Sequence, residues 1–210
     1  MDIALAVAWV RAIATSMDQH ADHLTELDAA IGDADHGHNM RRGFGRVLPA
    51  LDSYPHPRAT VGGVLVKTGT VLVTTMGGAA GPLYGSAFRA AGKGLNAPVA
   101  GPQALLMALS AALAAIQQLG GAGPGDKTMV DAFTAGVDAF DDATWRGATL
   151  AAAAAKAAAA ATAGARSTIP LQARKGRASY LGARSIGHQD PGATSTALIF
   201  DALAGVLAER

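Results

Sequence analysis

The stretch Asp28-Ala-Ala-Ile-Gly-Asp33-Ala-Asp35-His36-Gly-His-Asn-Met40 places three carboxylates within eight residues, directly after a long amphipathic segment. Such crowding of negative charge is repulsive unless a cation relieves it. Hard cations such as Mg²⁺ prefer oxygen ligands and commonly combine carboxylates with phosphate oxygens. The spacing also suits a helix end, a tight turn and the start of a second helix, where backbone N–H groups favour phosphate. The stretch therefore predicts a helix–turn–helix junction that holds a Mg-nucleotide site.

Helical periodicity extends in both directions from this junction. Residues 2–27 place apolar side chains at helical spacing, and a second helix is expected from about Asn39 to Leu51, ending before Pro55 and Pro57. Residues 60–74 are rich in valine and threonine and lean towards strand by local propensity. Their all-helical surroundings nevertheless favour a buried helix.

The helical pattern extends over the rest of the sequence. After a glycine-rich loop at 76–82, further helices are expected to about Gly92, over 102–119, from an Asp126 N-cap to about Phe140, over 147–164 and over 193–208. The glycines of 120–125 predict a flexible connection. There is no clear repeat, linker or alternating strand–helix unit. We therefore expect residues 1–210 to form one all-α domain of about eight helices.

Composition excludes several classes of function. The balance of 17 basic to 16 acidic residues argues against a nucleic-acid partner. The sequence has no cysteine, which excludes disulfides, thiolate zinc sites and cysteine nucleophiles. The start at Met1 lacks the features of a signal peptide, and no window approaches ~18 continuous strongly apolar residues. We expect a soluble cytoplasmic protein that has no membrane partner.

Four segments in the connections between the expected helices carry the chemistry. They are the aspartate turn at 28–39, Gly77-Gly78 with its neighbours, the segment 125–129, and the segment from 176 to 192. In this order they resemble the nucleotide-binding L subunit of dihydroxyacetone kinase, over about residues 1–208. One such segment alone would be weak support, but four in register are highly specific.

This resemblance implies an antiparallel barrel of eight α-helices, with Mg-ADP or Mg-ATP held in the loops at one end. It implies that Asp28, Asp33 and Asp35 hold two Mg²⁺ ions, which in turn hold the nucleotide phosphates. The residues that it implies around the nucleotide are His36, Gly37, His38, Asn39, Gly77, Gly78, Gly121 or the adjacent Gly120, Met129, Arg177, Asp190, Pro191 and Gly192. The sequence departs from the family pattern at Ala80, where serine is usual, so one hydroxyl contact to phosphate is missing.

Physical roles follow for the implied site residues. The metals neutralise charge on the transferred phosphoryl group. Gly77 and Gly78 let backbone approach phosphate without a Cβ in the way. Met129 offers a polarizable surface for a purine, and Arg177 a planar cation for phosphate or for stacking on the base.

Several of these residues also have ordinary interpretations. Aspartates at helix junctions are often caps and solvated turns. Taken alone, His38 is expected at the surface, whereas His36 is favoured as a hydrogen-bonding group of the site. The P-loop pattern is absent around Lys127, so we expect Asp126 to be a cap and Lys127 to be exposed.

The resemblance implies an incomplete enzyme, the phosphoryl-donor half of a dihydroxyacetone-type kinase. The keto-sugar would sit on a separate K subunit, without which this protein would be inactive. Either ATP exchanges at each turnover, or bound ADP is rephosphorylated by a phosphocarrier M subunit of the phosphoenolpyruvate phosphotransferase system. A free-standing L subunit slightly favours the second version.

Two functions from other classes stay open. One is a nucleotide-loaded binding module that regulates a transcription factor partner without turnover. The other is an all-α scaffold, which would show no Mg-dependent ligand. The many alanines also suggest that the barrel could leave space for an apolar guest.

Overall fold

The computed structural model describes residues 1–52 and 59–209, so the expected helix stop at Pro55 and Pro57 lies outside the described residues. Within these ranges the only pairing of strand type is an isolated bridge between Asp2 and Val99. The helices are α1 (Ile3–Gln19), α2 (Ala21–Ile31), α3 (His36–Leu51), α4 (Val61–Thr75), α5 (Ala80–Lys93), α6 (Pro102–Gly120), α7 (Met129–Trp145), α8 (Leu150–Ser167), the 3-10 helix η1 (Arg177–Ser185) and α9 (Pro191–Ala208).

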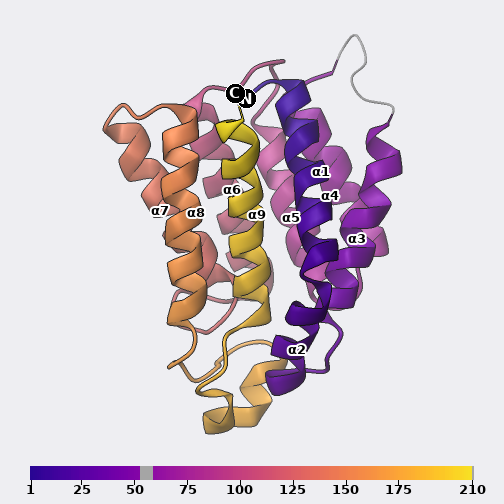
Figure 1. The fold of residues 1–210 in the computed structure, drawn as a ribbon, viewed down its shortest axis with the longest axis vertical. Coiled ribbons are helices and arrows are strands. Elements are labelled where there is room, and N and C mark those ends of the chain that lie inside the picture. The colour runs from indigo at the N-terminus through magenta and orange to yellow at the C-terminus, as the bar shows by residue number, and fades with distance from the viewer. Residues whose placement is uncertain (53–58, 210) are drawn as a thin grey trace.

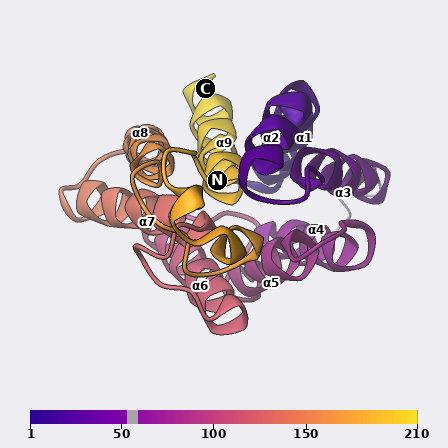
Figure 2. The ribbon, with the colours of Figure 1, turned by 90° about the horizontal axis from the view of Figure 1, so that it is seen from below.

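The long helices form a closed antiparallel barrel. From α3 to α9 each helix packs against the next in the sequence, and α1 closes the ring by packing against both α3 and α9 (Figure 2). Successive long helices run in opposite directions, and both termini lie at one end, while α2 and η1 lie at the other (Figure 1). This arrangement confirms the expected barrel, whose eight members are α1 and α3 to α9.

The expected helix over residues 2–27 is in fact two helices. α1 ends at Gln19, and His20 leaves the helical region with φ −105° and ψ 9°. Its ring Nδ1 lies 2.8 Å from the carbonyl oxygen of Ser16, in the last turn of α1. The backbone then continues as α2 at the end of the barrel, which brings Asp28 to the loops there.

Close packing explains why the valine- and threonine-rich α4 is a helix. A Cβ added at Gly62 would lie 2.1 Å from the carbonyl oxygen of Gly92, and one at Gly69 would lie 2.4 Å from that of Gly85. The backbones of α4 and α5 therefore touch along one glycine-lined face. Tertiary packing of this kind overrides local strand propensity.

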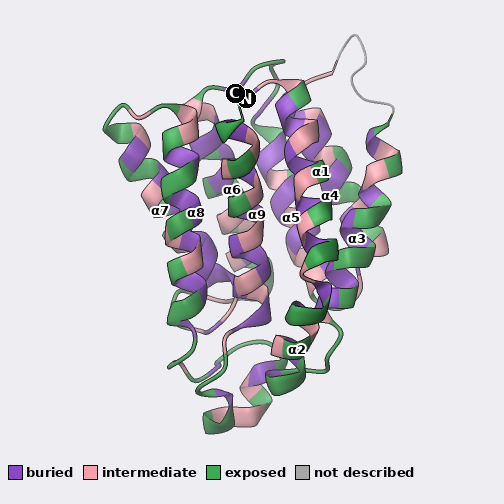
Figure 3. Cartoon of the chain, in the orientation of Figure 1, coloured by how far each residue is buried: buried purple, intermediate pink, exposed green. Residues whose placement is uncertain are grey.

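Side chains fill the interior of the barrel, as the buried inward faces of the helices show (Figure 3). The rings of Trp9 and Phe88 lie 5.9 Å apart between centroids, and those of Phe133 and Phe200 lie 5.2 Å apart. A cavity of about 20 Å³ remains between these rings, which is about the space that one water occupies. A space of this size does not hold the apolar guest considered above.

Two helices, α6 and α9, are long and apolar enough by length and composition to cross a membrane. Both belong to the barrel, where α9 packs against α1, α7 and α8, and α6 against α5 and α7. Core helices of soluble proteins have the same length and composition, so the two helices are weak support for a membrane span.

Candidate functional site

The loops at the α2 and η1 end of the barrel bring the four sequence segments together around a cavity of about 430 Å³. This volume lies in the range of small-molecule and cofactor sites. The predicted site residues that line it are Asp28, Asp33, Asp35, His36, Asn39, Gly77, Gly78, Met129, Arg177, Asp190, Pro191 and Gly192, with Gly120 and Ala80 beside them.

Three predicted residues do not line this cavity. A Cβ at Gly37 would lie 1.9 Å from the carbonyl oxygen of Ala21, so Gly37 packs against α2. His38 is exposed, and its Nδ1 lies 3.2 Å from the hydroxyl of Thr25. Gly121 adopts the left-handed conformation that ends α6, and its neighbour Gly120 lines the cavity in its place.

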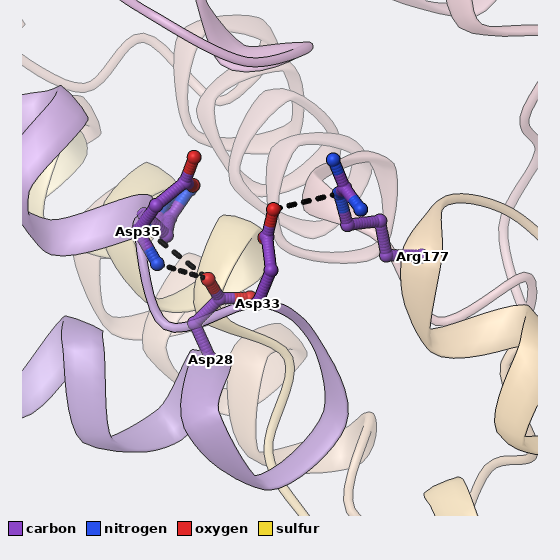
Figure 4. A network of polar contacts seen from close by, with 5 residues as sticks. Asp28, Asp33, Asp35 and Arg177 are labelled. Atoms are coloured by element: carbon purple, nitrogen blue, oxygen red, sulfur yellow. Dashed lines mark hydrogen bonds and ion pairs between the residues drawn. The ribbon is translucent and has the colours of Figure 1, made fainter.

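The aspartate turn is organised by the buried carboxylate of Asp28 near the end of α2. One of its oxygens accepts the backbone N–H groups of Asp35, at 2.9 Å, and His36, at 3.1 Å (Figure 4). A Cβ at Gly32 would lie 2.0 Å from the other oxygen. Asp28 therefore caps the start of α3 from the preceding helix, and glycine at position 32 leaves room for it.

The three carboxylates of the turn converge. Asp28, Asp33 and Asp35 each have a carboxylate oxygen within 4.8 Å of the others, and Asp33 and Asp35 are exposed on the cavity side. Oxygen donors that meet in this way beside an open cavity fit a hard cation that also takes phosphate oxygens. The donor set therefore fits magnesium.

Arg177, at the start of η1, reaches across to this turn. Its Nε lies 3.0 Å from Oδ2 of Asp33, and the arginine side chain is 70% exposed (Figure 4). An ion pair as exposed as this one contributes about 1 kcal/mol or less to stability. The ion pair places the positive guanidinium group of Arg177 beside the carboxylates at the edge of the cavity.

The antiparallel barrel also directs helix N-termini at the cavity. The helices α3, α5, α7 and α9 begin at this end, and their first residues, His36, Ala80, Met129 and Pro191, all line the cavity. The N-terminus of a helix carries unpaired N–H groups and a partial positive charge, both of which favour phosphate. The cavity thus combines carboxylates that suit a cation with backbone dipoles that suit an anion.

Gly77 and Gly78 serve different purposes in the turn between α4 and α5. A Cβ at Gly77 would lie 2.4 Å from Nη2 of Arg42 and 2.5 Å from Oδ1 of Asn39, so position 77 has no room for a side chain. Gly78 has φ +64°, and a Cβ there would make only ordinary contacts. Space therefore requires glycine at 77, whereas backbone conformation favours it at 78.

Lys127 is buried, which corrects the expectation that it is exposed. Its Nζ donates to the carbonyl oxygen of Thr168 at 2.6 Å and to that of His188. Burial lowers the pKa of Lys127, while the negative charges of Asp190 and Asp131 act in the opposite direction. Lys127, just before α7, thus holds Thr168 and His188, which lie at the two ends of the segment that contains η1.

Thr128, and not Asp126, is the N-cap of α7. Its hydroxyl accepts a backbone N–H of the first turn, and the carboxylate of Asp131 accepts the N–H of Thr128 in return at 2.8 Å. Asp126 instead accepts the N–H of Gly123 at 2.8 Å, so the glycine-rich connection is tied down. The Thr-x-x-Asp spacing is a capping-box signal that could have located this cap from the sequence.

A buried series of hydroxyl groups supports the cavity and was not predicted. Nε2 of His36 lies 2.9 Å from the hydroxyl of Ser195, which lies 2.8 Å from that of Tyr84. Tyr84 also contacts Thr196, at 2.9 Å. Burial lowers the pKa of His36, while the negative charges of Asp28 and Asp35 act in the opposite direction. Burial raises the pKa of Tyr84. These hydroxyls belong to helix interiors with no motif, so no sequence signal marked them.

Asp190 is the N-cap of α9, and its carboxylate accepts the N–H of Ala193 at 2.7 Å. Burial raises the pKa of Asp190 to about 7, against the opposing effects of that hydrogen bond and of Lys127. The aspartate predicted to lie at the nucleotide therefore also starts a helix whose end faces the cavity.

The protein belongs to the DAK2 domain family, which matches residues 30–205. It is 39% identical to the ADP-binding subunit DhaL of the PEP-dependent dihydroxyacetone kinase of Escherichia coli, over 94% of each sequence. It is 36% identical to the ADP-binding subunit DhaL of the PTS-dependent dihydroxyacetone kinase of Lactococcus lactis, over 99% of this sequence and 100% of the relative.

A solved structure has the same fold. The dihydroxyacetone kinase of C. freundii in complex with AMP-PNP and Mg²⁺ superposes with a TM-score of 0.72 at 28% identity. The match covers 96% of this protein but 34% of the C. freundii kinase, so this protein spans about a third of that kinase. The barrel and the kinase resemblance inferred from the sequence are confirmed by these relatives.

Proposed function

We propose that this protein is the nucleotide-binding, phosphoryl-donor subunit of a dihydroxyacetone-type kinase. It holds ADP or ATP with two Mg²⁺ ions in the cavity at the barrel end, and acts in the cytoplasm on a small keto-sugar held by a separate K subunit. The observation that carries the proposal is the convergence of three carboxylates and four helix N-termini on one cavity of about 430 Å³.

Each part of the cavity suits one part of a Mg-nucleotide. Asp28, Asp33 and Asp35 would hold the metal, which supplies neutralisation of phosphate charge when bound. The turn at Gly77 and Gly78 and the start of α3 lie beside these carboxylates and would hold phosphate oxygens. Apolar side chains line the same cavity and would accept the base; they include Leu83, Ile116, Ala122, Met129 and Val130.

The protein offers positioning and charge neutralisation rather than proton transfer. Burial disfavours the charged form of His36, and its ring lies 2.9 Å from the hydroxyl of Ser195, where it serves as a hydrogen-bonding group. Arg177 and the helix N-termini would stabilise negative charge on the transferred group. Positioning and electrostatic stabilisation are the main requirements of phosphoryl transfer.

We further propose that a phosphocarrier M subunit rephosphorylates bound ADP. The sequence matches nearly the full length of relatives named as ADP-binding subunits of PEP- or PTS-dependent kinases. A subunit that keeps bound ADP suits rephosphorylation in place.

The test is reconstitution of the protein with a dihydroxyacetone-binding K subunit, with formation of sugar phosphate and binding of the K subunit measured separately. We expect Asp33→Asn to abolish turnover but to keep binding of the K subunit, because it removes one metal ligand and one exposed ion pair, to Arg177. Asp22→Asn, at an exposed position of α2, is the matched control and should keep full turnover. A wild-type protein that binds a regulator but never supports turnover with any K subunit would favour the binding-module alternative.

A further inference from the structure

Arg42 bridges two of the segments that form the cavity. Its Nη2 donates to Oδ1 of Asn39, one turn earlier in α3, at 2.9 Å. Its Nε donates to the carbonyl oxygen of Thr75, the last residue of α4, at 3.1 Å. Arg42 itself does not line the cavity, whereas Asn39 is buried and does.

This contact fixes the orientation of the Asn39 side chain. A guanidinium has only N–H donors, whereas an asparagine amide has an acceptor oxygen on one side and an NH₂ donor on the other. Because Arg42 can only donate, Oδ1 of Asn39 must face it, and Nδ2 must face the other way. A Cβ built at Gly78 would lie 3.4 Å from Nδ2, so this donor faces the turn between α4 and α5.

Gly77 encloses the same contact. A Cβ at position 77 would lie 2.4 Å from Nη2 of Arg42 and 2.5 Å from Oδ1 of Asn39. Any larger residue would displace one of the two atoms that form the hydrogen bond. The Arg42–Asn39 pair and Gly77 are therefore one unit, built from α3 and the turn between α4 and α5.

We propose that Arg42 is a positioning residue, which holds the Asn39 amide so that its NH₂ group donates to a phosphate oxygen in the cavity. With the amide reversed, a carbonyl oxygen would face the phosphate from this side of the cavity. Arg42 thus acts on the anion through Asn39 and not by direct contact. This inference rests on the proposed nucleotide site.

A double-mutant cycle on Mg-ADP affinity, measured by calorimetry, tests the inference. Asn39→Ala and Arg42→Ala should each weaken binding roughly tenfold, the value of about one hydrogen bond to a charged group. Because the proposal has Arg42 act on the anion through Asn39, the double variant should bind no more weakly than Asn39→Ala alone. Losses that multiply in the double variant would overturn the proposal, as would unchanged binding by Arg42→Ala.

Two further variants separate positioning from charge and from misfolding. Arg42→Lys keeps the positive charge but lacks the planar fork that reaches both Asn39 and Thr75, so we expect it to bind as weakly as Arg42→Ala. Wild-type affinity in Arg42→Lys would show a purely electrostatic role and overturn the proposal. Arg41→Ala, at the neighbouring exposed position, should bind normally. Absence of Mg-ADP binding by the wild-type protein would instead refute the proposed function.

Discussion

Single glycines at the cavity are required for different physical reasons, although Gly77 and Gly78 are adjacent and identical in sequence. The prediction that both let backbone approach phosphate assigned them one role. The structure separates them, because a Cβ at Gly77 would lie 2.4 Å from Nη2 of Arg42 in α3, whereas one at Gly78 would make only ordinary contacts. Both sets of neighbours lie more than thirty positions earlier in the sequence. Sequence alone shows that a glycine is present but does not show which atoms surround it.

Alanine substitutions at the two glycines should therefore differ. Gly78→Ala should lower the free energy of unfolding by about 1 kcal/mol, because alanine at φ +64° is strained. It should weaken Mg-ADP binding less than Gly77→Ala does, because its Cβ would make only ordinary contacts. Gly77→Ala should weaken Mg-ADP binding, because its Cβ displaces the Arg42–Asn39 pair. Urea unfolding and calorimetry of both variants measure this; equal affinities for the two would contradict the assignment.

At the scale of elements, local patterns predicted which segments are helical, but not how the segments are joined. Apolar periodicity located α3, α6, α8 and α9 to within a few residues. The break at His20, the 3-10 helix η1 and the burial of Lys127 were missed, because each depends on contacts between distant segments. Lys127, for example, gains its partners from residues 168 and 188.

Lys127 also adopts a positive φ of 61°, which gives a paired prediction. Lys127→Ala should lower the free energy of unfolding by about 2 kcal/mol or more, because two buried carbonyl groups lose their donor. Lys127→Gly loses the same donor but relieves the backbone, so it should be about 1 kcal/mol more stable than Lys127→Ala. Lys156→Met, at an exposed position of α8, is the control. If urea unfolding showed Lys127→Gly to be less stable than Lys127→Ala, this account would be contradicted.

The start of α9 should make stability depend on pH. The pKa of Asp190 is about 7 in the folded protein against an ordinary value of 3.8, so between these values the folded state holds a proton that the unfolded state has released. The free energy of unfolding contributed by Asp190 therefore falls as pH rises from 4 to 7.

Asp190→Asn keeps an acceptor for Ala193 but does not titrate. As pH rises from 4 to 7, the free energy of unfolding of the variant should increase by about 4 kcal/mol relative to that of the ligand-free wild type. Lys127, Asp131 and Asp28 surround position 190 in both proteins, so the difference reports position 190. If the free energies of unfolding of the two proteins, measured by chemical unfolding, changed in parallel with pH, Asp190 would not be protonated in the folded protein.

On the scale of the whole molecule, the antiparallel barrel accounts for the position of the site. Because successive helices alternate in direction, every second helix begins at the same end, and the loops there come from four separate parts of the sequence. Those loops contain the four segments that carry the family resemblance. The resemblance therefore predicted that the four segments meet at one end of the barrel. The supporting hydroxyls of Tyr84, Ser195 and Thr196 were not found, because they lie within helices.

The central claim is that this end of the barrel holds a Mg-dependent nucleotide. The most direct test measures the nucleotide content of the purified protein, and its exchange with excess ATP, before and after a chelator removes Mg²⁺. Our account predicts bound ADP that excess ATP does not displace and that leaves after chelation. Rapid Mg-dependent exchange with ATP would keep the site but contradict the phosphocarrier version. A protein that carries and binds no nucleotide in a Mg-dependent way would contradict the central claim.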